Sequence, residues 1–151
     1  MSEAGAAEPA GSRSSSTRSK ARKRALDILF ESELRGTDPL QTLAERAADA
    51  TSPIRDYTAT LVKGVHAHAD DIDRRIAGAL KAGWTLPRLP RVDRTALRIA
   101  TYELDYTDLP PAVAVAEAVH LVSELSTDES PTFVQGVLGG LTRDRQGGAV
   151  S

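Results

Sequence analysis

Apolar residues along this chain recur three and four positions apart, which is the spacing of helices that bury one face. Leu97, Ala100 and Leu104 follow this spacing within residues 91–106, and a similar apolar stripe follows Ser130. No segment alternates apolar and polar residues between turn signals, as a half-buried strand would. The pattern predicts an all-α protein with about seven helices in two consecutive helical-bundle subdomains.

Prolines and glycines divide this pattern into separate helices. Asp38-Pro39, Ser52-Pro53 and Ser130-Pro131 each place a potential capping side chain before a proline, a combination typical of a helix start. Gly36 is typical of a helix end. The predicted helices cover residues 18–35, 39–50, a segment opening at 52–53, 70 or 71 to about 83, 91–106, the segment after 108–111 as far as 125, and the segment after 130.

The two ends of the chain lack this pattern. Residues 1–17 are rich in Ala, Gly, Ser, Glu and Pro, and they carry too little apolar surface to order themselves, so we predict a disordered tail there. Residues 146–151 are predicted to fray, which leaves a helical domain at 18–145. The chain has no cysteine and no apolar run of ~18–20 residues, so we expect a cytoplasmic protein without membrane association.

Positive charge is concentrated where the first helix begins. The formal net charge of the chain is −2, yet four of the five residues at 20–24 are Lys or Arg. Arginine-rich segments of this kind bind RNA phosphates and often become ordered on binding. A basic tail that only aids solubility is the alternative explanation from charge alone.

Both phenylalanines are displaced from the apolar stripes of their helices. On a helical wheel, Phe30 lies about 140° from Ala25, the centre of the predicted core face, and about 20° from Lys23. Phe133 lies about 90° from the centre of its stripe. An aromatic ring beside a cation can stack on a base while the cation contacts a phosphate; packing against a neighbouring helix is the alternative. The predicted core face of the first helix consists of Ala21, Ala25, Ile28, Leu29 and Ser32.

No group of residues predicts catalysis, a cofactor or a metal. His66 and His68 are two positions apart, so on a helix they point to nearly opposite sides and do not share one ion. No phosphate-binding glycine motif is present, and no nucleophile is accompanied by a base at a recognisable spacing. The sequence therefore predicts a protein that is not an enzyme.

Four segments, in order, resemble the NusB family of transcription antitermination factors. They are RSKARKRALDILFESEL from residue 18, RVDRTALRIATYEL from residue 91, PPAVAVAEAVHLVSEL from residue 110 and DESPTFVQGVLGGL from residue 128. With LVKGV at 61–65 and Trp84, the similarity covers about 18–143. It implies a two-subdomain RNA-binding protein that binds the boxA element of nascent ribosomal RNA leader transcripts together with a small-subunit ribosomal protein. The pair would join an RNA polymerase elongation complex with other Nus factors, and the resemblance leaves monomer and homodimer open.

The resemblance also implies which residues form the sites. The basic start of the family falls on Arg18, Lys20 and Arg22, and an RNA-contacting aromatic, usually tyrosine, falls on Phe30. An acid that faces the ribosomal protein falls on Asp93, for which a first-turn acid that stabilises the helix dipole is a second interpretation. With Lys23 from the helical wheel and with the second aromatic and the acid before it, the predicted RNA-binding residues are Arg18, Lys20, Arg22, Lys23, Phe30, Glu129 and Phe133.

Two positions depart from the family pattern. Ala116 and Gln135 stand where asparagines are usual, so polar contacts made by those asparagines would differ here. The alternative hypothesis for the whole chain is a non-enzymatic helical adaptor that binds protein partners only and carries an incidental basic tail.

Overall fold

The computed structural model describes the backbone of residues 10–150 and the side chains of residues 17–143. All regular structure in this part of the chain is helical, which confirms the all-α prediction of about seven helices. The elements are α2 (Ala10–Arg35), α3 (Pro39–Ala47), α4 (Asp56–Ala67), α5 (Ala69–Ala79), the short 3-10 helix η1 (Leu86–Arg88), α6 (Arg91–Tyr106), α7 (Pro111–Leu125) and α8 (Ser130–Val150).

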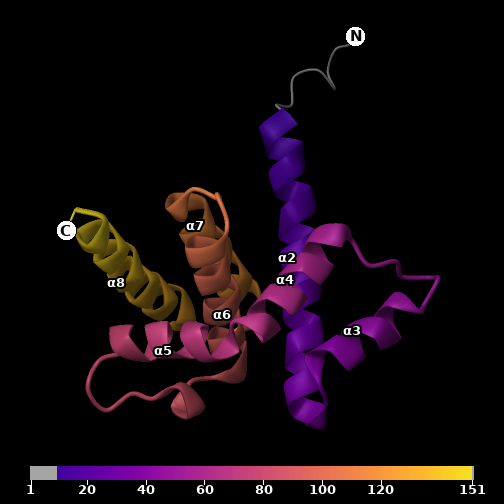
Figure 1. The fold of residues 1–151 in the computed structure, drawn as a ribbon, viewed down its shortest axis with the longest axis horizontal. Helices are drawn as coiled ribbons and strands as arrows, with labels where there is room; N and C mark the ends of the chain where they lie inside the picture. Colours follow the sequence, from indigo (N-terminus) through magenta and orange to yellow (C-terminus); the bar gives the residue numbers. More distant parts are fainter. Residues whose placement is uncertain (1–9, 151) are drawn as a thin grey trace.

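The helices form two consecutive groups that meet along α2 and α6. In Figure 1, α2 stands as a long rod with α3 on one side and α5 to α8 on the other, and α4 crosses it between them. Helix α2 packs against α3, α4 and α6, and α6 packs in addition against α4, α5, α7 and α8. Helix α6 is therefore the central element that joins the two subdomains.

The central position of α6 explains why polar residues are buried on it. Its apolar residues Ala96, Leu97, Ile99 and Ala100 are at most 1% exposed, although they cover more than one side of the helix. A helix that is buried on several sides also encloses the charged residues on those sides, and buried charges need partners. Arg94 and Glu103 are both buried, and both form ion pairs that are described below.

Most of the predicted helix boundaries are correct, but the start at Ser52-Pro53 is wrong, and the helices predicted to end at 50 and about 83 end earlier, at Ala47 and Ala79. Gly36 has φ +67° and ends α2, and the carboxylate of Asp38 accepts the Leu40 N–H at 2.8 Å at the start of α3. The predicted start at Ser52-Pro53 is wrong, because α4 begins at Asp56. The carboxylate of Asp49 accepts hydrogen bonds from the backbone N–H and the hydroxyl of Thr51, which holds this segment in a turn instead.

The outer helices extend further than the apolar pattern predicts. Helix α2 begins at Ala10, so it includes residues 10–17, which the sequence analysis assigned to a disordered tail. Helix α8 continues to Val150, beyond the predicted fraying point at 146. The predictions for residues 1–9 and 151 lie outside the described residues. None of the helices in the described part of the chain combines the length and the apolar character needed to cross a membrane.

Helices α4 and α6 approach each other closely at one glycine. A Cβ atom built on Gly64 would lie 2.2 Å from Cε1 of Tyr102, well inside van der Waals contact. The ring of Tyr102 is part of a stacked group with His68 and Tyr106, in which the His68 and Tyr106 ring centres are 3.8 Å apart. The absence of a side chain at Gly64 thus allows Tyr102 to lie against α4.

Candidate nucleic-acid interface

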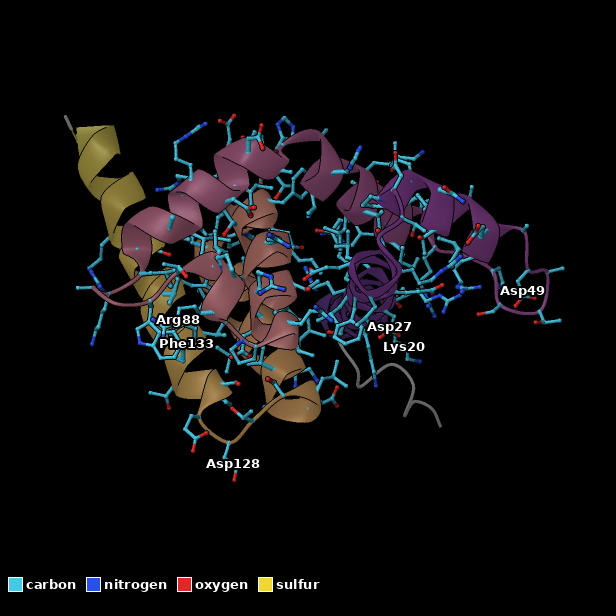
Figure 2. The ribbon with its side chains drawn as sticks, turned by 90° about the horizontal axis from the view of Figure 1, so that it is seen from below. Lys20, Asp27, Asp49, Arg88, Asp128 and Phe133 are labelled. Carbon is cyan, nitrogen blue, oxygen red and sulfur yellow. The ribbon has the colours of Figure 1, made fainter. Side chains whose placement is uncertain are left out.

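Three of the predicted cations on α2 are accessible from solvent. Arg18, Lys20 and Lys23 are exposed, and Figure 2 shows Lys20 beside the axis of α2. The guanidinium carbon of Arg18 lies 4.6 Å from the centre of the Tyr57 ring, which comes from α4. A cation over an aromatic face is held in place while its outer side stays open to a ligand. Tyr57 was not identified from the sequence, since only tertiary packing brings it to α2.

Arg22, which was also predicted to bind RNA, differs from the other three cations because it is buried. It is 1% exposed, and its Nε donates to Glu103 Oε2 at 2.9 Å while its Nη1 donates to Glu117 Oε1 at 3.1 Å. The Tyr57 hydroxyl also donates to Glu103. Arg22 therefore connects α2 to α6 and α7, and its guanidinium does not face the solvent beside Lys20 and Lys23.

The burial of Arg22 follows from the neighbours of α2. The predicted core face is confirmed at Ala21, Ala25, Ile28 and Ser32. A second buried face carries Arg22 and Leu26, four residues apart, because α2 packs between the α3–α4 side and α6. Burial alone would lower the pKa of Arg22, but the hydrogen bond and charge of Glu103 raise that pKa above its usual value. Arg22 thus stays charged inside the protein.

Phe30 lies at the edge of the core, half-buried, as the helical wheel indicates. The guanidinium carbon of Arg91, in the first turn of α6, lies 6.0 Å from the centre of the Phe30 ring. Asp27 is exposed on α2 between Lys23 and Phe30, so a negative charge interrupts the basic stripe (Figure 2). Arg91 could not be identified from the sequence because it is distant in the chain, whereas the position of Asp27 follows from the helical wheel.

Phe133 lies in the first turn of α8, half-buried, beside an aromatic ring from another part of the chain. Its ring centre is 5.9 Å from that of Trp84, and the two ring planes are tilted by 46°. Glu129 is exposed, and its carbonyl oxygen accepts the Phe133 N–H at 3.1 Å. Arg91 at the start of α6 lies over Phe30, and the preceding Pro90 lines a hollow together with Phe133, so the start of α6 lies between the two predicted aromatic positions.

Asp93, the residue predicted to face the ribosomal protein, is also buried. It is 2% exposed, and its carboxylate accepts hydrogen bonds from the hydroxyls of Ser126 at 2.6 Å and Ser130 at 2.9 Å. The Ser130 hydroxyl in turn accepts the Thr127 N–H. These hydrogen bonds link α6 to the connection between α7 and α8, and they direct the Asp93 carboxylate toward the interior of the protein. Ser130 opens α8 as predicted, but its hydroxyl belongs to this network.

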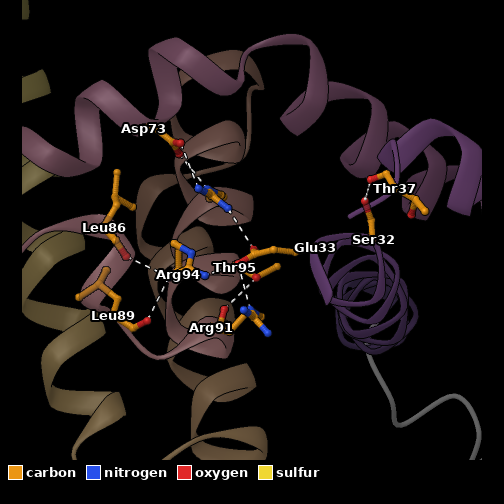
Figure 3. Close-up of polar contacts among 10 residues, drawn as sticks. Ser32, Glu33, Thr37, Asp73, Leu86, Leu89, Arg91, Arg94 and Thr95 are labelled. Carbon is orange, nitrogen blue, oxygen red and sulfur yellow. Dashed lines mark hydrogen bonds and ion pairs between the residues drawn. The ribbon is translucent and has the colours of Figure 1, made fainter. Parts of the chain in front are cut away.

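Glu33 joins the two subdomains through arginines of α6. Figure 3 shows its carboxylate reaching from α2 toward Arg91 and Arg94. The Arg91 Nε donates to Glu33 Oε2 at 3.0 Å, Arg94 donates to the same oxygen, and Arg98 Nη1 lies 3.5 Å from Oε1. Burial alone would raise the pKa of Glu33, but these arginines, Arg94 foremost, hold the pKa below its usual value.

This depressed pKa gives a pH-dependent contribution to stability. A carboxyl with a lower pKa in the folded state stabilises the fold above its unfolded pKa, near 4.5, and the contribution is lost as the pH falls through the folded pKa. We expect E33Q to lower the free energy of unfolding at pH 7 and to flatten its decrease below about pH 5, as measured by urea unfolding over a pH series. E129Q, which removes an exposed carboxylate, is the control; an E33Q profile parallel to that of the unmodified protein would contradict this.

The described residues contain no group of three or more His, Cys, Asp or Glu side chains placed to hold a metal ion. What the described surface offers instead is a set of cations on α2 and two half-buried phenylalanines on either side of the start of α6. The fold and this surface define an all-helical protein that presents exposed cations and half-buried aromatic rings.

Comparisons with known proteins identify the family. The model of the NusB family matches residues 19–143, and the chain belongs to that family. It is 52% identical over 131 residues to the Transcription antitermination protein NusB of a Nocardioides species, a match that covers 86% of this chain and 96% of the relative. These findings confirm the resemblance that the four sequence segments indicated.

Solved structures agree with this assignment. NusB of T. maritima is 32% identical and superposes with a TM-score of 0.74 over 83% of this chain and 90% of that one. A structure described as the antitermination factors NusB and NusE in complex with dsRNA contains a chain that is 29% identical, with a TM-score of 0.73 over 84% of this chain and 96% of that one.

Proposed function

We propose that this chain is a transcription antitermination factor that binds the boxA element of nascent ribosomal RNA leader transcripts. It does so together with a small-subunit ribosomal protein, and the assembly joins an RNA polymerase elongation complex with other Nus factors. The protein acts in the cytoplasm, catalyses no reaction and uses no cofactor. A related chain has been solved with NusE and dsRNA, which supports both an RNA and a protein partner.

The observation that carries this proposal is the pair of exposed cations Lys20 and Lys23, which lie on the same side of α2 as a half-buried aromatic ring, together with Arg18, which is exposed on another side of α2 beside Tyr57. Arg18, Lys20 and Lys23 are free to contact phosphates, and Phe30 offers a face on which a base can stack. Arg91 lies over the same ring, so a base there would meet both an aromatic face and a cation. Arg22 does not contact RNA in this proposal. Its buried guanidinium holds α2 against α6 and α7 through Glu103 and Glu117.

Phe133 and Glu129 form the second part of the proposed RNA site. Phe133 supplies another stacking surface at the start of α8, where free backbone N–H groups and the helix dipole favour a phosphate. The exposed carboxylate of Glu129 accepts hydrogen bonds from base amino groups, which provides a means of selecting sequence. Asp93 contributes indirectly, because it holds Ser130 and thus the start of α8.

A salt titration tests the electrostatic part of the proposal. Three phosphates neutralised by Arg18, Lys20 and Lys23 should contribute about −2 to the slope of log affinity against log salt for single-stranded RNA. Binding should be tighter to a boxA sequence than to a scrambled RNA of the same length. A flat slope, or equal affinity for both RNAs, would favour the alternative of an adaptor that binds protein only.

Substitution of the two phenylalanines tests the stacking part. F30A and F133A should each weaken RNA binding by about 1–3 kcal/mol, measured by fluorescence anisotropy of labelled RNA, because each removes one stacking face. Circular dichroism should show unchanged helicity. L34A, which truncates a residue of α2 that is 57% exposed, is the matched control and should bind RNA normally. Unfolding of F30A or F133A would show that these rings are core residues instead.

A further inference from the structure

A second aromatic ring lies beside Phe133 and is not explained by packing. Trp84, the only tryptophan of the chain, is 49% exposed. Half-exposure of so large an apolar side chain is unusual unless the ring has a partner. The turn that carries it is well defined: Gly83 has φ +92°, the Trp84 N–H donates to the Lys81 carbonyl at 3.0 Å, and Arg88 donates to the Gly83 carbonyl at 2.9 Å. The ring is thus presented at the surface by a fixed turn.

Trp84 and Phe133 together separate two surface hollows, because both rings line each of them. One hollow, of about 390 Å³, is also lined by Pro90 and by the polar residues Thr127 and Glu129. The other hollow, of about 490 Å³, is also lined by the cations Lys81 and Arg143. One side of the aromatic pair therefore offers hydrogen-bonding groups, and the other side offers positive charge.

From this arrangement we propose that Trp84 and Phe133 bind an unstacked base of single-stranded RNA, whose phosphates are contacted by Lys81 and Arg143. A base has an aromatic face that stacks on exposed rings and an edge that hydrogen-bonds to hydroxyl and carboxylate groups, and it is always joined to a phosphate. The two rings match the face of the base, the polar residues of the first hollow match its edge, and the two cations match the phosphate. An apolar peptide would use the rings but not the two cations.

The site is continuous with the RNA-binding face on α2, and the inference rests on the proposed RNA-binding function. Pro90 lines the first hollow, and the next residue, Arg91, has its guanidinium over Phe30. The start of α6 thus connects the Phe30 position to the Trp84–Phe133 pair. The RNA would pass from α2 across the start of α6 to α8.

Because the chain has one tryptophan, its fluorescence reports on this site alone. Titration of the full chain with a boxA oligonucleotide should quench Trp84 emission over the same concentration range in which the anisotropy of the labelled RNA rises. W84L should weaken binding roughly 5- to 150-fold, the equivalent of one lost stacking contact, and W84F should retain most of the affinity. Thermal unfolding of W84L establishes that the variant is folded.

Three further variants test the cations and the specificity of the effect. K81Q and R143Q should each reduce the magnitude of the salt slope by about 0.7, as expected for one lost contact to single-stranded RNA. Y106L removes another exposed aromatic ring, at the opposite end of α6, and should leave RNA affinity unchanged.

The outcomes separate this inference from the proposed function. If W84L binds RNA as tightly as the unmodified protein, the inference is overturned, whatever the fluorescence shows. If F30A still weakens RNA binding in that case, the proposed function stands. If W84L loses a protein partner but keeps RNA affinity, the pair is a protein-binding surface and the inference is again wrong. If the unmodified chain binds no RNA, both proposals fail together.

Discussion

Replacement of Arg22 with methionine should lower the free energy of unfolding by about 3–5 kcal/mol, because it leaves a buried carboxylate without its counter-ion. Glu103 is 1% exposed and receives the Arg22 guanidinium at 2.9 and 3.1 Å. Methionine keeps most of the side-chain volume but removes the charge and every donor. The Tyr57 hydroxyl would remain as a donor to Glu103, and one neutral donor does not replace a cation.

Urea unfolding monitored by circular dichroism measures this effect. R22M/E103Q removes the unpaired charge together with its partner and should recover a large part of the loss. K23M, the neighbouring exposed position, should change stability by no more than about 0.5 kcal/mol. RNA binding by R22M should be normal at temperatures where the variant is folded. If R22M is fully stable and still loses RNA affinity, Arg22 contacts RNA directly, as the sequence analysis predicted.

Introduction of a single methyl group at Gly64 should destabilise the protein by about 1–3 kcal/mol. The new Cβ would lie 2.2 Å from the Tyr102 ring, and this ring is stacked with His68 and Tyr106. Accommodation of G64A therefore requires a shift of the whole aromatic group or a separation of α4 from α6. Alanine is normally preferred over glycine inside a helix, so the expected sign is opposite to the usual one.

G136A is the matched control for this prediction. Gly136 is also inside a helix, and a Cβ built there meets nothing within 4 Å, so G136A should be neutral or stabilising by up to about 1 kcal/mol. In G64A/Y102A the clash is absent, and the double-mutant cycle should show a favourable coupling between the two changes. A G64A variant as stable as the unmodified protein would show that the two helices are not held at this distance.

The fold could largely be predicted from the sequence because its signals are local. Helical spacing within 91–106 and the caps at Asp38-Pro39 depend on residues a few positions apart, and the structure places α6 and α3 where these signals indicate. The error at Ser52-Pro53 has the same origin. A competing local interaction, the side chain of Asp49 with Thr51, is as short in range as the predicted cap and prevails there.

The candidate site could be predicted only in part, because the burial of a side chain depends on more than one neighbour. A helical wheel assumes one buried face, and on α2 it correctly identified Ala25 and Ile28 as core. It also placed Phe30 away from the centre of that core face, and the structure shows this ring half-buried. It could not show that α6 and α7 cover the face of Arg22 or that Asp93 turns inward to two serines.

By itself, the sequence determined the helical class of this protein, its family and the segment where positive charge is concentrated. These properties follow from residue spacing and composition, which depend only on residues that are close together in the sequence. The tertiary structure alone decided which cations remain outside, since Arg22 and Lys23 are adjacent in sequence but only Arg22 meets carboxylates from α6 and α7. It also brought Arg91 to Phe30 and Trp84 to Phe133. Such contacts join residues that are far apart in the chain, and only the packing of the helices against one another creates them.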